Sequence, residues 1–520
     1  MFNNKISKMK YSGNKHFISA LVIAVCVFMS KATGVLRDIF FAKYLGSSII
    51  GEAFYIAFRL PNTFRRMFAD GAFSNVFVPF FSTKIKENKN DALIFANRVL
   101  FLLVCFLFLI TILIEIFMPE LIGLINPGFI RDKNRFDMAI VLSRIAFPYI
   151  IFISISALFG SMLNGIGSFW QFASISIILN AVLIFGLCFT NNLFSNTGFC
   201  LVWMIIFAGI LQVVILFISC IRKQLITFGK KIDSIKNGRQ KNNDVKIFLK
   251  KLIPAIFSSG ILQINIFVDC IFASFFAGAI SHLYYTDRIG QFPLSLIGYS
   301  LSIAILPALS IAFKEKDNAK IASIQTDSVD IAMFFSIPLT LLIITLATPI
   351  IQLIYERGMF TASDTIIVSN MIRIYAITIP FNILSKIFFV SFYARKDTST
   401  PLKISIFSLI FNIISNLILI HIVGRYCVII STTLSSILST IITIIFLKKN
   451  NDLMLKIKDC KKTTIILLIS SFSCCVLPSI LYYTFNLHLF TSLCICCIFH
   501  LCLMFFTGIL SKNLISRLLG

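Results

Sequence analysis

The sequence predicts an all-α membrane protein with about fourteen transmembrane helices. Of its 520 residues, 58% are hydrophobic and 13% are charged, and the mean hydropathy is +0.92. Runs of about 20 apolar residues recur along the chain, which is the length an α-helix needs to cross a bilayer. Two polar interruptions, 222–251 and 448–462, are too short to form soluble domains. Nearly the whole chain is therefore expected inside the membrane.

The apolar segments are bounded by charged or turn-forming residues. They cover 17–45, 50–82, 92–118, 137–165, 169–190, 197–221, 247–277, 282–313, 326–355, 364–394, 401–421, 424–447, 463–484 and 487–511. The first follows four lysines, as in a signal peptide, but no small-residue cleavage site comes after it. We therefore interpret it as a retained helix.

Basic residues are distributed unevenly between the two sides of the predicted helices. With both termini on one side, the loops of that side hold roughly 30 Lys and Arg, against about 5 on the other. This asymmetry predicts that both termini and both basic loops are cytoplasmic. It also explains the net charge of +25 without binding to nucleic acid.

An internal repeat divides the chain into two similar parts. Pro148 is followed by Asn180 at the same spacing at which Pro380 is followed by Asn412. The two copies lie six predicted spans apart, and an even number of spans gives both parts the same orientation in the membrane. The prediction is an N-lobe of six helices (1–221), a basic cytoplasmic linker (222–246), a C-lobe of six helices (247–447) and two C-terminal helices (448–520).

Cations inside three of the spans are the first functional candidates. A charge near the bilayer centre costs roughly 2.5–3.5 kcal/mol, so such residues usually face a polar interior. The cations outnumber the nearby acids, and the arginine fork suits bidentate contact with phosphate oxygens. Arg37, Arg65 and Arg288 are therefore predicted to bind an anionic cargo. The alternative is that they pair with acids such as Asp38 and Glu52 and only hold helices together.

Other polar residues accompany these arginines. Ser30 and Arg37 lie two helical turns apart and share a helix face, and Asn62 and Arg65 share another. Lys31 is a weaker candidate because its ammonium acts as a point charge. The polar candidates of these spans are Ser30, Lys31, Arg37, Glu52, Asn62, Arg65 and Arg288.

A second polar constellation involves the C-lobe. Asp269 is an acid within an apolar span, Asn412 and Asn416 share a helix face, and Thr432 lies one turn beyond Val428. Carboxylate, amide, hydroxyl and carbonyl oxygens are the ligands that small hard cations prefer. The same spacing also fits a buried, hydrogen-bonded polar cluster, and both interpretations stay open.

The motifs that an enzyme would show do not occur in the sequence. It has no Gly-rich phosphate loop and no Ser/His/Asp set, and its fourteen cysteines match no zinc, haem or iron–sulfur spacing. We expect a transporter rather than an enzyme, without a resident cofactor.

Four longer motifs occur in order along the chain. The first is Ser30-Lys-Ala-Thr-Gly-Val-Leu-Arg-Asp38 with Phe58-Arg-Leu-Pro-Asn-Thr-Phe-Arg-Arg-Met-Phe-Ala-Asp-Gly71. The others are Tyr284-Tyr-Thr-Asp-Arg288, Tyr355-Glu-Arg-Gly-Met-Phe-Thr361 and Phe392-Tyr-Ala-Arg-Lys-Asp-Thr398. Together they resemble the MurJ (MviN) family of lipid II flippases, in the MOP exporter superfamily. The two C-terminal spans match only in hydropathy and position.

The resemblance implies a fold of two six-helix lobes plus two extra helices in the bacterial cytoplasmic (inner) membrane. The implied cargo is lipid II, the undecaprenyl-diphosphate-linked peptidoglycan precursor, moved from the inner to the outer leaflet by alternating access. Ser30, Arg37, Arg65 and Arg288 match the family's cavity residues. Lys31 stands where arginine is usual, and Glu52 where aspartate is common. Membrane lipids and cell-wall synthesis proteins are the other expected partners.

The resemblance also bears on the cation. Some family members have a sodium site, and Asp269, Asn412, Asn416, Thr432 and the Val428 carbonyl match its arrangement. Na⁺ is thus a candidate coupling ion, with the membrane potential as the other energy source. Two alternative functions remain, namely export of another lipid-linked oligosaccharide on the same fold, or a membrane-embedded enzyme of wall synthesis.

Overall fold

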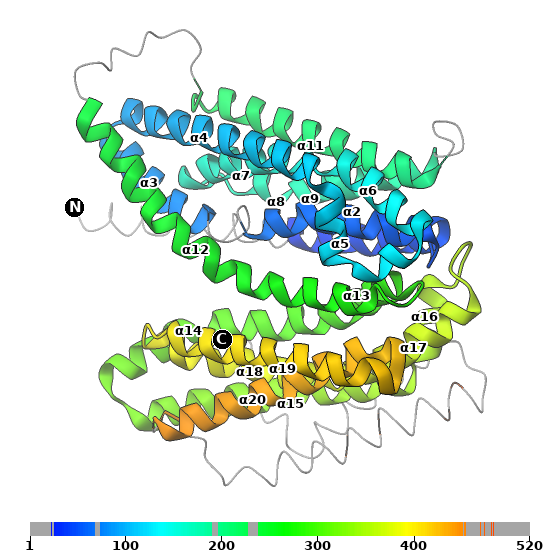
Figure 1. Cartoon of the computed structure of the whole chain (residues 1–520). Coiled ribbons are helices and arrows are strands. Elements are labelled where there is room, and N and C mark those ends of the chain that lie inside the picture. Colours follow the sequence, from blue (N-terminus) through cyan, green and yellow to red (C-terminus); the bar gives the residue numbers. More distant parts are fainter. Residues whose placement is uncertain are drawn as a thin grey trace. The chain divides into compact units, whose positions relative to one another are not determined.

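The computed structural model describes residues 22, 25–67, 73–189, 196–226, 238–450, 452 and 453, together with positions 469, 473, 480 and 482. All regular elements in these ranges are helices (Figure 1). Eight helical stretches among them are long and apolar enough to cross a membrane. The predicted all-α, multi-span class is confirmed. The two spans predicted within 448–520 lie almost wholly outside the described residues.

The first compact unit is Met1–Gly278. Residues 25–44 form its first described helix. The next elements are α2 (Ile49–Met67), α3 (Ser74–Glu87), α4 (Lys89–Ile116), α5 (Met118–Ile125), η2 (Pro127–Arg131), α6 (Lys133–Ala146), α7 (Tyr149–Gly165), α8 (Trp170–Ala173), α9 (Ile175–Cys188), α11 (Thr197–Arg222) and α12 (Gly238–Ala273). Helix α2 packs mainly on α6, and α11 packs on α7 and α9.

The second compact unit is Ala279–Gly520. Its elements are α13 (Ala279–Pro293), η4 (Leu294–Tyr299), α14 (Ser300–Glu315), α15 (Asn318–Thr345), α16 (Ala347–Tyr355), α17 (Ala362–Ala376), α18 (Thr378–Ala394), α19 (Ser399–Val423), η5 (Gly424–Tyr426) and α20 (Cys427–Lys449). Helix α13 packs on α17, α18 packs on α14, α15 and α20, and α19 packs on α20 (Figure 1).

Helix α12 belongs to the first unit by its contacts (Figure 1). The Phe248 ring packs edge-on against the rings of Phe73, Phe77 and Phe95. In the same region, Lys84 of α3 forms an ion pair with Asp244 at 2.5 Å. The sequence repeat instead placed residues 247–277 at the start of the C-lobe. The predicted lobes are defined by the sequence repeat, whereas the two compact units are defined by contacts between residues. The lobe boundaries therefore stay a prediction.

Two predicted spans change their helical geometry at a proline. The span 137–165 consists of α6 and α7, which meet at Phe147 and Pro148. In the second unit, Pro293 ends α13 and is followed by the π-helix η4. Proline removes a backbone donor and clashes with the preceding turn. Hydropathy does not register this effect, so the sequence alone showed continuous spans here.

Helix α4 shows how this chain meets lipid. Its best 18-residue window has a mean hydropathy of 3.1, yet Phe101, Phe108 and Ile116 are exposed. An apolar helix that stays exposed is expected where hydrocarbon replaces water as the solvent. This surface is therefore the lipid-facing side of the first unit.

The start of α19 is fixed by the Asp397 carboxylate. Its Oδ1 atom accepts hydrogen bonds from the backbone N–H groups of Ser399 and Thr400, both at 3.0 Å. Hydrogen bonds from Thr400, and in addition from Ser399, lower the pKa of Asp397 to about 2. The carboxylate is therefore ionised at neutral pH, where it suits the positive end of the helix dipole.

Gly128 is predicted to tolerate no larger side chain. A Cβ atom there would overlap the backbone of Ser274 and Phe275, whereas one at Gly123 would meet only side-chain atoms at ordinary distances. Overpacking costs about 1–3 kcal/mol, so Gly128→Ala should lower the melting temperature of the purified protein. Gly123→Ala is the matched control and should melt like the unaltered protein. Equal melting of both variants would contradict this packing.

Candidate functional site

Arg37 is the most deeply buried of the three predicted cargo arginines. Its side-chain Nη2 and Nε atoms donate to Asp38 Oδ1 at 2.7 and 3.0 Å, and Nη1 donates to Asn180 Oδ1 at 2.9 Å. The guanidinium carbon lies 5.2 Å from the ring centroid of Phe41. A buried charge is tolerated when it is both paired and hydrogen-bonded. Here Asp38 supplies the charge and Asn180 fixes the orientation.

Asn180 connects α9 to the helix of residues 25–44. Its Nδ2 atom donates to the Ser30 carbonyl and to Thr33 Oγ1, both at 3.1 Å. One amide therefore holds both Arg37 and the polypeptide two turns earlier. Sequence reasoning used Asn180 only as a marker of the repeat and missed this role. The one sequence signal for Asn180 was its match to Asn412 in the repeat. That match predicts equivalent positions in the two halves, but it does not identify the residue that Asn180 contacts.

Helix α2 supplies a second pair of predicted cargo residues. Arg65 Nε donates to Asn62 Oδ1 at 3.2 Å, and both side chains are half-buried. Arg59, one turn before the pair, donates to the Cys270 thiol of α12. Lys31 is exposed on the first helix. The expected shared face of Asn62 and Arg65 is confirmed.

Glu52 forms a buried ion pair with Arg135. Arg135 Nη2 donates to Glu52 Oε2 at 2.9 Å, and Arg135 and Glu52 are 6% and 1% exposed. The guanidinium carbon of Arg135 lies 4.1 Å from the ring centroid of Phe129. Sequence reasoning did not single out Arg135, which lies at the edge of an apolar span. In the structure, Glu52 is bonded to Arg135. Its role in cargo binding stays a prediction.

Arg288 belongs to the second unit. It is half-buried on α13, and its guanidinium carbon lies 4.7 Å from the ring centroid of Tyr284, one turn earlier. A cation over an aromatic face is stabilised by the ring quadrupole. The structure thus positions Arg288 within its own unit, and its grouping with Arg37 and Arg65 stays a prediction.

The candidate cation ligands of α19 and α20 lie together. Asn416 Nδ2 donates to the Asn412 carbonyl and to Asn412 Oδ1, both at 3.0 Å, and Asn412 Nδ2 donates to Thr432 Oγ1 at 3.4 Å. Asn412, Asn416 and Val428 are buried. Asn416 Oδ1 has no hydrogen-bond partner among the described residues. An unpartnered buried acceptor fits a hard cation.

Asp269, the fifth predicted cation ligand, belongs to the first unit. Its inclusion in the set stays a prediction. Within the described ranges, no group of three or more His, Cys, Asp or Glu side chains could hold a metal ion.

A family model described as lipid II flippase MurJ matches residues 41–496. The chain belongs to the MurJ lipid II flippase family. A protein named as a probable lipid II flippase MurJ, from Rickettsia prowazekii (strain Madrid E), is 41% identical over 421 residues, 81% of each chain. Membership makes the chain a membrane transporter of lipid II and not an enzyme, as the sequence predicted.

Solved structures agree with this family. A MurJ lipid II flippase in an inward closed conformation has a TM-score of 0.78 and 27% identity, covering 95% of this chain and 100% of that one. An inward-facing MATE multidrug transporter of the MOP superfamily has a TM-score of 0.69 and 14% identity, covering 83% and 98%. The second likeness concerns the fold alone. The predicted fold class, an all-α protein with many membrane spans, is shared with both structures.

Asn180→Ala is predicted to destabilise the MurJ fold around Arg37. The change removes the Oδ1 acceptor of the buried Arg37 guanidinium and the Nδ2 group that donates two hydrogen bonds to the first helix. This loss costs about 1–3 kcal/mol. The melting temperature of the purified protein should fall, and lipid II transport with it. Asn134→Ala, at an exposed position of α6, is the control and should change little. An unaltered melting temperature in Asn180→Ala would show that these bonds do not stabilise the fold.

Proposed function

We propose that this flippase binds the diphosphate of lipid II through intramembrane arginines and moves it by alternating access. The supporting observation is the network around Arg37, in which a buried guanidinium is oriented by Asn180 and Asp38. A pre-oriented fork loses little entropy when it binds phosphate oxygens in a bidentate manner. Held in this way, Arg37 would offer its remaining N–H groups to the diphosphate.

The balance of charge along the first two helices supports an anionic cargo. Cations outnumber acids in residues 25–67, and one of the acids, Glu52, is bonded to Arg135 of another helix. The cations of this segment are Lys31, Arg37, Lys43, Arg59, Arg65 and Arg66, and the acids are Asp38 and Glu52. A diphosphate would neutralise the surplus and relieve the repulsion between the cations. Cargo binding would therefore favour the conformation that brings them closest together.

Each proposed ligand has a distinct contribution. Arg37 and Arg65 bind phosphate oxygens, with the Ser30 hydroxyl and the Asn62 amide as neighbouring polar groups, and Lys31 adds long-range attraction as a point charge. Arg288 is the proposed ligand from the C-lobe. The polyprenyl tail stays in lipid, because burying it in a charged site would gain nothing.

The orientation in the membrane is also part of the proposal. The excess of Lys and Arg on one side supports both termini and the linker in the cytoplasm of a bacterium, with the protein in its inner membrane. Lipid II is then taken from the inner leaflet and released at the outer leaflet. Membrane lipids and cell-wall synthesis proteins are the proposed neighbours.

Sodium is the proposed coupling ion. Asn412, Asn416, Thr432 and the Val428 carbonyl would hold it, and Asp269 would add the one carboxylate. The unpartnered Asn416 Oδ1 atom supports a ligand at this place, since no described residue donates to it. A bound Na⁺ would supply positive charge that stabilises one conformation over another.

Arg288→Ala should reduce lipid II flipping in reconstituted vesicles by about 10–100-fold, because charge-assisted hydrogen bonds contribute about 1.5–3 kcal/mol. Arg288→Lys should recover only part of the rate, since lysine keeps the charge but not the fork. Arg222→Ala, at an exposed end of α11, is the control and should flip normally. Full activity of Arg288→Ala would remove this residue from the proposed site.

Replacing Na⁺ by K⁺ in the same vesicle assay should slow flipping, because K⁺ is too large for a compact set of oxygens. Asn416→Ala and Asp269→Ala should each abolish the difference between the two salts. The sodium proposal is refuted by rates that are equal in both salts together with full activity of Asp269→Ala. That result would leave the arginine site untouched.

A further inference from the structure

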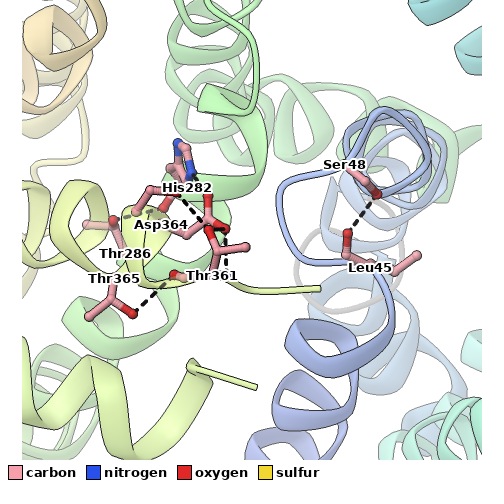
Figure 2. A network of polar contacts seen from close by, with 8 residues as sticks. Leu45, Ser48, His282, Thr286, Thr361, Asp364 and Thr365 are labelled. Atoms are coloured by element: carbon pink, nitrogen blue, oxygen red, sulfur yellow. Dashed lines mark hydrogen bonds and ion pairs between the residues drawn. The ribbon is translucent and has the colours of Figure 1, made fainter. Parts of the chain in front are cut away.

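A buried histidine–aspartate pair joins the starts of α13 and α17. His282 Nε2 lies 2.7 Å from Asp364 Oδ1, and the two residues are 2% and 4% exposed. Asp364 Oδ2 accepts hydrogen bonds from the backbone N–H and the hydroxyl of Thr361, at 2.8 and 2.9 Å (Figure 2). The carboxylate also lies at the N-terminus of α17, where a negative charge is favoured. Asp364 is thus stabilised as an anion independently of His282.

The same position in the first unit holds the ion pair of Glu52 and Arg135. Glu52 and His282 are each the fourth residue of their helices, α2 and α13, and Arg135 and Asp364 are each the third residue of α6 and α17. Both offsets along the chain agree, to within a few positions, with the offset between Pro148 and its repeat partner Pro380. The two pairs therefore occupy equivalent places, with the positions of acid and base exchanged.

The two pairs differ in how they respond to pH. A Glu–Arg pair keeps both charges across the physiological range, whereas histidine gains or loses its charge near neutral pH. We propose that His282 and Asp364 form a proton-binding site that strengthens the packing of α13 on α17 when the imidazole is protonated. A bound proton converts a single hydrogen bond into an ion pair like that of the first unit.

Protonation adds a second donor at His282 Nδ1. This buried atom has no hydrogen-bond partner among the described residues, so an N–H there would be left unsatisfied, which opposes protonation. The equivalent pair tolerates the same defect, since Arg135 Nε is also a buried N–H group without a partner in the described part of the chain. In each unit a full charge facing a carboxylate offsets this cost. The carboxylate is Asp364 at 2.7 Å in the second unit and Glu52 at 2.9 Å in the first.

The other ionisable groups on the neighbouring segments have bonds of their own or lie farther along the chain from His282. Helix α13 packs on α17 and η4; η4 has no charged residue, and Arg373 of α17 bonds to Thr348 and Asn370. In the segment before α17, Glu356 accepts from Gln352, and Arg357 donates to the Leu353 carbonyl. On α13 itself, Asp287 and Arg288 follow His282 by more than one turn. Tyr285, Tyr355 and Phe360 form the adjoining ring cluster.

The proposal is tested by melting the purified full chain between pH 5.5 and 8.5. A histidine that gains a partner on folding stabilises the protein at low pH, and this gain is lost as the pH rises. The melting temperature should therefore fall with rising pH by about 2–4 °C more in the unaltered protein than in His282→Gln. His421→Gln, at an exposed position of α19, is the control and should keep the full dependence. Identical profiles for the unaltered protein and His282→Gln overturn the proposal.

A second measurement does not depend on the folding of His282→Gln. Replacing the other four histidines (His16, His421, His488 and His500) by glutamine leaves His282 as the single histidine. The ¹⁵N signals of its labelled imidazole should change from the charged to the neutral form between pH 5.5 and 8.5. A ring that stays neutral throughout this range overturns the proposal, as does one that stays charged.

Discussion

Every charge in this chain that lies within the membrane needs a partner, because hydrocarbon offers none. Arg37 has Asp38 and Asn180, and Glu52 has Arg135. Each of these bonds joins residues of different helices or fixes the geometry of a side chain. The polar network therefore helps to determine which helices pack together and how the Arg37 side chain is oriented.

Two kinds of polar contact result from this constraint. At the helix starts, complete acid–base pairs join α2 to α6 and α13 to α17, and in the second pair the charges balance once His282 is protonated. Farther along the first two helices, cations exceed acids. Balanced pairs stabilise the bundles, whereas the surplus makes binding of an anion favourable. The same chemistry thus supports the fold in one place and, in our proposal, lipid II recognition in another.

The sequence was sufficient for the fold class, because hydropathy and the distribution of Lys and Arg act over whole helices. It also singled out Arg37 and Arg65 as candidates, since a cation in an apolar span is conspicuous. It did not reveal that Asn180 orients Arg37, or that Arg135 neutralises Glu52, because those partners lie 143 and 83 residues away. The break at Pro148 and the π-helical turn after Pro293 were missed for a different reason, since averaged hydropathy does not register a lost backbone hydrogen bond.

Recognition of the cargo through its diphosphate is the central claim. Native mass spectrometry of the purified protein can compare lipid II with undecaprenol, which has the same tail but no diphosphate. Lipid II should bind, and undecaprenol should not displace it. Arg37→Lys should weaken the binding of lipid II and leave that of undecaprenol unchanged. Equal binding of both lipids, unaffected by Arg37→Lys, would contradict the claim.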